Sequence, residues 1–222
     1  MRTFLPIIST LFSRKQILRC AAGLLAVCSS AAVLAAGLPS IDSAISVPPT
    51  PLGSTLLRGG PGAFGAGREN GKKHTGVDIV ANQSSANKEL YRVMAVSDAI
   101  VAYARMNGSD ETGFGYTIIL DHANGFYTQY SHLAQVASSG IVKKGDAVRK
   151  GQTIGYLANP PELSSGNVRA EVVKPYDKIQ LHFECFSAPS GRSSTGAIAP
   201  IKKDYRLLDP TKRLTELRYK SF

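Results

Sequence analysis

The stretch YTIILDHANGFYTQY, residues 116–130, indicates most clearly how this chain folds. Residues 116–120 and 126–130 are rich in aromatic and β-branched side chains, which favour extended strands. The dipeptide Asn124-Gly125 between them is typical of the tight turn of a β-hairpin, because Asn and Gly tolerate positive φ angles. The stretch therefore predicts two adjacent antiparallel strands joined by a short turn.

The chain on both sides of this hairpin has the same β character. Residues 93–103 are rich in small and β-branched side chains, and Gly-containing turns at 144–146 and 150–152 bracket short strands that end within 153–157. A helical period extends over a useful length only near 210–219. Many short strands with Gly-containing turns predict an all-β domain with a mainly antiparallel sheet core, sandwich- or barrel-like.

The remaining segments divide the chain into a leader, a linker, a domain and a tail. Residues 1–36 contain basic residues followed by an uncharged apolar run that ends in small residues, a pattern typical of a secretory signal peptide. An uncleaved signal anchor is the alternative, because the basic region is unusually long. Residues 37–60 are rich in Pro, Ser and Gly and predict a linker. We expect the domain at 61–210, with a long loop at 158–178, and a tail at 211–222.

The charge of the chain limits the partners that we expect, and its cysteine content limits the disulfides that it can form. The formal net charge is +10, and the leader holds four of the 26 Lys and Arg and none of the 16 Asp and Glu, which leaves +6 for the rest. In an exported protein this balance favours anionic envelope polymers over nucleic acid, although a solvated basic surface explains it equally well. Two of the three cysteines lie in the leader, so the mature chain keeps only Cys185 and forms no internal disulfide. A monomer is the default expectation.

The segment His74-Thr75-Gly76-Val77-Asp78 places an imidazole and a carboxylate four residues apart. This spacing puts both side chains on the same side of a helix or of an extended strand. Gly76 and the β-branched residues around Asp78 disfavour a helix and favour an extended edge. Taken alone, the pair is better explained as a surface ion pair than as part of a site.

A second polar segment, Gln180–Glu184, has the alternation of a strand with two different faces. Gln180, His182 and Glu184 share one face, whereas Leu181, Phe183 and Cys185 share the other. The polar face is interpreted as the site and the apolar face as core, where Cys185 is a buried, inert thiol. Taken alone, His182 is explained as a hydrogen-bonded histidine on a half-exposed sheet.

Two further histidines lie close to the hairpin. His132, in Tyr130-Ser131-His132-Leu133, follows the second strand at the point where the chain leaves the sheet, so its side chain can reach a cleft. His122 lies beside Asp121 just before the turn and is interpreted as a residue that stabilises the hairpin. It is therefore left out of the candidate site.

The order of these segments resembles that of the lysostaphin-type (LytM-type) zinc metallopeptidases over about residues 60–210. The resemblance implies an antiparallel β core with a groove formed by long loops, and one Zn²⁺ held by His74, Asp78 and His182. It also implies that His132 and the first His of a terminal H-x-H orient the attacking water. Gln180 occupies the place of that first His. The matching motifs are Phe64–Arg68, Lys73–Ile79, Tyr130–Leu133, Gly145-Asp146 with Gly151–Gly155, and Leu181–Glu184.

The resemblance implies an exported zinc endopeptidase that hydrolyses peptide bonds in peptidoglycan cross-links, in the periplasm, in the cell envelope or after secretion. Two imidazoles and one carboxylate leave a fourth tetrahedral position for a water whose pKa zinc lowers to roughly 7. Gln180 can hold a water or an oxyanion but cannot transfer a proton. The alternative is therefore a catalytically impaired member that binds the cell wall or activates an amidase. A basic β-domain that binds polyanions is a third reading, but it leaves the ordered His and Asp residues unexplained.

Overall fold

The structure is a computed structural model, and its described residues are 40–68, 71–81, 88–107, 114–123, 125–134, 138–158, 179–188, 205–217 and 220–221. The chain divides into two units, residues 1–37 and 38–222. The predicted signal segment at 1–36 lies outside the described residues. So do residues 159–178 of the predicted long loop, and with them much of the predicted groove.

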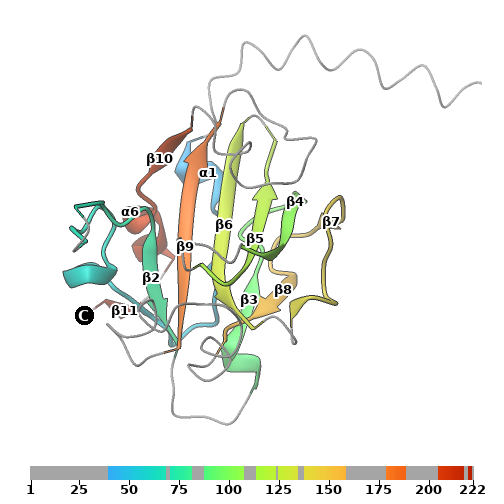
Figure 1. Ribbon diagram of the computed structural model, residues 1–222, viewed down its shortest axis with the longest axis horizontal. Coiled ribbons are helices and arrows are strands. Elements are labelled where there is room, and N and C mark those ends of the chain that lie inside the picture. The colour runs from blue at the N-terminus through green and yellow to red at the C-terminus, as the bar shows by residue number, and fades with distance from the viewer. Residues whose placement is uncertain are drawn as a thin grey trace, which may run out of the picture. The chain divides into compact units, whose positions relative to one another are not determined.

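A nine-stranded sheet forms the centre of the second unit, with the strand order β11-β1-β2-β9-β6-β5-β4-β7 and with β10 paired to β9 (Figure 1). Every pair in it is antiparallel except β1 with β11. The all-β, mainly antiparallel prediction is confirmed. The strands of this sheet are β1 (Thr55–Leu56), β2 (Val77–Val80), β4 (Ala99–Met106), β5 (Tyr116–Asp121), β6 (Phe126–Leu133), β7 (Ala147–Val148), β9 (Gln180–Ser187), β10 (Arg206–Leu208) and β11 (Lys220–Ser221).

Smaller elements lie beside this sheet. A two-stranded antiparallel sheet joins β3 to β8. The helical segments are short. These elements are β3 (Arg92–Met94), β8 (Thr153–Tyr156), α1 (Ile41–Ala44), α6 (Thr211–Glu216), and the 3₁₀ turns η3 (Gly60–Gly62) and η4 (Lys88–Tyr91).

The predicted hairpin is present as β5 and β6. Their register pairs Ile119 with Gln129 and Leu120 with Thr128. In the turn, Ala123 and Gly125 have positive φ angles of 67° and 74°, as a tight reversal between strands requires. β6 continues to Leu133, three residues beyond the predicted end of its strand.

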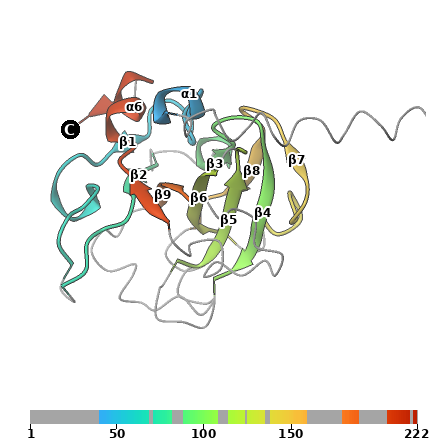
Figure 2. The same cartoon turned by 90° about the horizontal axis from the view of Figure 1, so that it is seen from above.

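One face of the central strands carries the main hydrophobic core. Leu181, Phe183 and Cys185 of β9 lie in it, fully buried, as the alternation predicts. α1, α6, β3 and β8 cover this face (Figure 2). The opposite face of β9 therefore remains for polar residues, and a second, smaller apolar cluster lies at its far end: Tyr103, Ile119, Tyr127, Phe186 and Ala188.

The packed domain extends beyond the predicted boundaries at 61 and 210. Ile45 and Leu56 of the predicted linker are buried in the main core. Leu214 of the predicted tail is buried there as well. The side-chain Nε–H of Arg213 donates to the carbonyl of Ile45 at 2.9 Å, which joins the two ends of the domain. The Pro, Ser and Gly residues of 40–60 lie in short turns between isolated buried apolar residues, and no periodic pattern in the sequence predicts such an arrangement. Among the described residues, no helix is long and apolar enough to span a membrane.

Candidate metal centre

Strand pairing between β2 and β9 brings the predicted metal ligands together. The register places Asp78 directly opposite His182. His74 lies three residues before β2 begins. Between them, a Cβ on Gly76 would press into the backbone carbonyl of Phe183 and come within 2.9 Å of the Glu184 side chain. Only glycine therefore lets this segment approach β9 so closely.

Three side-chain atoms from these residues converge on one point. His74 Nε2 lies 2.8 Å from His182 Nδ1, and Asp78 Oδ1 lies 3.3 Å and 3.2 Å from these two nitrogens. The three residues are only 4%, 2% and 3% exposed. Tetrahedral zinc with bonds near 2.0–2.1 Å separates its ligand atoms by about 3.4 Å. The cluster is slightly tighter than that, and it fits a single small cation.

The hydrogen bonds on the outer side of each imidazole fix which nitrogen faces the cluster. His74 Nδ1–H donates to the carbonyl of Ala63 at 2.9 Å, and His182 Nε2–H donates to Glu184 Oε1 at 2.9 Å. In the neutral rings, the lone pairs of His74 Nε2 and His182 Nδ1 therefore both face Asp78 Oδ1. Three electron-rich atoms at such short distances repel one another unless a cation lies between them.

The electrostatics of the cluster lead to the same conclusion. When no cation is bound, a proton takes its place inside the cluster. Burial by itself would then raise the pKa of Asp78, but hydrogen bonds with His182 and His74 hold it well below its ordinary value. Burial by itself would lower the pKa of His182, but its hydrogen bonds to Asp78 and Glu184 raise it to about 9. The cluster thus attracts positive charge strongly, and a metal ion can replace the proton.

The structure places His132 beside this cluster, at the end of β6. Its ring centroid lies 5.9 Å from that of His182 in an edge-to-face arrangement. Its backbone has φ 64°, which is strained for a non-glycine residue. The N–H donates to the carbonyl of Phe114 and the carbonyl accepts from Ala158, at 2.9 and 3.0 Å, so both flanks hold this conformation.

The environment of His132 keeps its imidazole neutral. Burial first, and then the charge of His182, lower its pKa to about 4. The side chain is 6% exposed, and its Nδ1 has no hydrogen-bond partner within the part of the chain that the structure describes. A buried, neutral and unpaired imidazole nitrogen next to a metal cluster can bind a water or a substrate group.

Gln180, the other predicted catalytic residue, lies on β9 two positions before His182 and therefore on the same face. It is 7% exposed, and its Oε1 also lacks a partner among the described residues. The structure thus brings all five predicted site residues to one face of the sheet.

Two neighbours of the cluster have roles that the sequence did not indicate. Phe114 stacks on the ring of His182, with a centroid separation of 5.0 Å and an interplanar angle of 27°. Glu184 bonds to His182. Strand alternation places Glu184 on the correct face, but it does not identify the atom to which the carboxylate bonds. Phe114 precedes β5 in a segment without any strand pattern, so no signal in the sequence predicts its contact.

His122 lies away from the cluster, as expected. Its Nε2 bonds to Thr128 Oγ1 at 2.7 Å, its Nδ1 lies 3.3 Å from the carbonyl of Asp98, and its ring contacts Phe126. These contacts hold the hairpin to the residue just before the start of β4. Partial burial of the His122 imidazole lowers its pKa to about 4.

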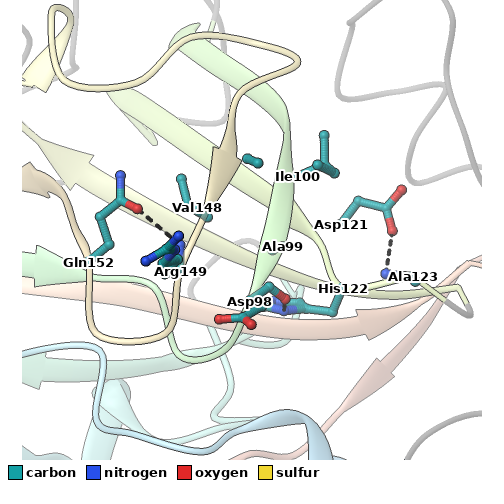
Figure 3. A pocket seen from close by; sticks show the side chains of 10 residues that line it. Asp98, Ala99, Ile100, Asp121, His122, Ala123, Val148, Arg149 and Gln152 are labelled. Atoms are coloured by element: carbon teal, nitrogen blue, oxygen red, sulfur yellow. Dashed lines mark hydrogen bonds between the residues drawn. The ribbon is translucent and has the colours of Figure 1, made fainter. Parts of the chain in front are cut away.

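A pocket of about 600 Å³ lies between β4, β7 and the β5–β6 turn (Figure 3). Polar groups on its lining are bonded to backbone: Asp121 accepts from the N–H of Ala123 at 2.8 Å, and Gln152 accepts from the N–H of Arg149 at 3.0 Å. None of the three predicted metal ligands lines it. The pocket lies at the opposite end of β6 from His132.

The sequence of the chain is similar to those of known peptidases. The chain matches Peptidase family M23 over residues 72–187. It is 28% identical over 138 residues to the cell division protein DipM of Caulobacter vibrioides, and the match covers 62% of this chain but only 18% of that protein.

Among solved structures, the catalytic domain of the antimicrobial peptidase lysostaphin from Staphylococcus simulans is 23% identical, with a TM-score of 0.42, and the match covers 68% of this chain and 88% of that one. A zinc-containing peptidase from Vibrio cholerae is 20% identical, with a TM-score of 0.41, and the match covers 64% of this chain and 36% of that one.

Proposed function

Because the chain belongs to peptidase family M23, we propose that it is a zinc-dependent endopeptidase that hydrolyses peptide bonds in peptidoglycan cross-links. The observation that carries the proposal is the convergence of His74 Nε2, Asp78 Oδ1 and His182 Nδ1 within 3.3 Å of one another. Three protein ligands of this kind leave the fourth position of a tetrahedral zinc site open, as catalytic zinc sites require.

Held by His74, Asp78 and His182, zinc would act as a Lewis acid for the scissile carbonyl and would lower the pKa of a bound water to roughly 7. Residues of the chain itself would bind and orient the water and the substrate. His132 is neutral, and its Nδ1 has no partner in the described part of the chain, which supports a role in hydrogen-bonding either the attacking water or the oxygen that becomes negative as the carbonyl is attacked. Gln180 on the same face of β9 orients a polar group of the substrate by hydrogen bonding.

Gln180 also supports a second candidate function. An amide cannot accept and return a proton, and the loss of general acid–base catalysis typically costs about 10² to 10⁴ in rate. A family member that keeps its metal ligands and lacks this proton carrier would bind the cell wall, or activate an amidase, without efficient hydrolysis.

One experiment separates the two functions. The zinc-loaded chain is incubated with purified peptidoglycan, and newly formed amine termini are quantified for the wild type, Gln180→His and His182→Ala. Release by the wild type that His182→Ala abolishes supports the endopeptidase. Stoichiometric zinc without release by the wild type, together with release by Gln180→His, contradicts it and supports the impaired member.

We further propose that the chain is exported through its N-terminal segment and acts as a monomer in the cell envelope, periplasm or surrounding medium. Its positive charge suits contact with anionic envelope polymers, and nucleic acid is not an expected partner. Membrane contact would come only through an uncleaved N-terminal segment. N-terminal sequencing of the protein from cell fractions tests this, because a mature chain that begins near residue 37 is expected, and an intact N-terminus in the cytoplasm would contradict export.

A further inference from the structure

Glu184 is a fully buried carboxylate on the same face of β9 as His182. Its Oε1 accepts two hydrogen bonds, one from His182 Nε2–H at 2.9 Å and one from the hydroxyl of Thr75. A carboxylate that is removed from water is costly unless it is well bonded. This buried carboxylate lies next to His182, a predicted metal ligand.

The two hydrogen bonds connect separate segments of the candidate metal centre. Thr75 directly follows His74 in the chain, whereas His182 comes from β9. One carboxylate oxygen therefore joins the imidazole of one metal ligand to the backbone segment that carries another. Because Glu184 accepts a hydrogen bond from Nε2–H, the lone pair of His182 lies on Nδ1 and is directed towards His74 and Asp78.

We propose that Glu184, braced by Thr75, is a positioning residue that fixes His182 in the Nδ1-ligating tautomer and orientation and thereby sets the zinc affinity of the site. This inference rests on the proposed zinc site. Without the carboxylate, the His182 ring is free to rotate or to carry its proton on Nδ1, and both changes remove a ligand atom from the cluster.

The neighbouring strand offers a matched control. Gln129 lies directly opposite Glu184 on β6 and is equally buried. Its amide Nε2–H donates to Ser131 Oγ at 3.0 Å, and it bonds to none of the three ligands. A substitution at Gln129 therefore disturbs the same buried layer without changing the tautomer of His182.

The test measures zinc affinity of the full chain by competition with a chromophoric chelator. We expect Glu184→Gln to weaken zinc binding about 10- to 100-fold, the usual effect of losing an outer-sphere partner of a ligating His. Thr75→Val should weaken zinc binding less than Glu184→Gln does. Thr75→Ser keeps the hydroxyl and should bind zinc as tightly as the wild type, and Gln129→Leu should leave the affinity within twofold of the wild type. The visible absorption of the Co²⁺-loaded chain should shift in Glu184→Gln and stay unchanged in Gln129→Leu.

The possible results are distinct. Wild-type zinc affinity and an unchanged cobalt spectrum in Glu184→Gln would overturn the positioning role and leave the zinc site intact. A wild-type chain that binds no zinc would overturn the proposed function together with this inference. If Glu184→Gln fails to fold, the Thr75 pair decides, because equal affinities of Thr75→Val and Thr75→Ser would overturn the brace.

Discussion

His132 is held in a strained backbone conformation, and one ring nitrogen has no partner among the described residues. Such strain persists only where neighbouring contacts enforce it. The residue lies beside the cluster without contributing an atom to it. We expect His132→Ala to keep zinc binding within about twofold of the wild type and to reduce amine release from peptidoglycan roughly 100-fold or more. Zinc content and amine release are measured on the same preparation. Undiminished release would remove His132 from the reaction.

The lowered pKa of His122 leads us to expect that the stability of the fold depends on pH. Its folded pKa of about 4 lies below its ordinary value of 6.5, so the unfolded chain takes up the proton more readily. Its contribution is therefore complete above about pH 6.5 and is lost as the pH falls towards 4. Thermal unfolding midpoints of the wild type should fall over that interval, and those of His122→Gln should fall less steeply. Parallel profiles would show that His122 is protonated equally in both states.

Single residues differ in how far the sequence alone predicted them. The spacing from His74 to Asp78 and the strand alternation around His182 predicted only which side chains share a face, because both are short-range properties of the chain. The resemblance of the ordered motifs to the zinc metallopeptidases implied that His74, Asp78 and His182 form one metal site. The contacts of Phe114 and Glu184 with His182 depend on atoms that only the folded sheet brings together.

At the scale of strands, the close approach of β2 to β9 builds the site, and Gly76 permits it. Gly76→Ala would place a methyl group against the backbone of Phe183. We expect a loss of about 1–3 kcal/mol in the free energy of unfolding, measured with denaturant, and weaker zinc binding. Gly67→Ala is the control, because a Cβ there meets nothing within 4 Å. Equal stabilities of the two variants would show that β2 can shift away without cost.

The hairpin β5–β6 was predictable because the Asn-Gly turn and the strand composition agree. The position of β2 was not, since the sequence suggested an extended edge and the strand lies between β1 and β9. β1 has only two residues and lies in a Pro-, Ser- and Gly-rich segment, where composition masks the pairing.

At the scale of the whole molecule, both ends of the described domain pack on the main core. Leu214 of α6 is fully buried there. We expect Leu214→Ala to lower the free energy of unfolding by about 2–5 kcal/mol, whereas Lys212→Ala on the exposed side of α6 should change it by less than about 0.5 kcal/mol. Equal effects would show that the C-terminal segment is a dispensable tail.

The proposed function depends above all on one metal ion held jointly by the segment before β2, by β2 itself and by β9. Its most direct test is the zinc content of the purified full chain after equilibrium dialysis, compared with that of Asp78→Asn and His182→Ala. We predict about one zinc ion per wild-type chain and a loss of most of it in both variants. Wild-type protein that retains no zinc, or variants that retain as much as the wild type, would contradict the account.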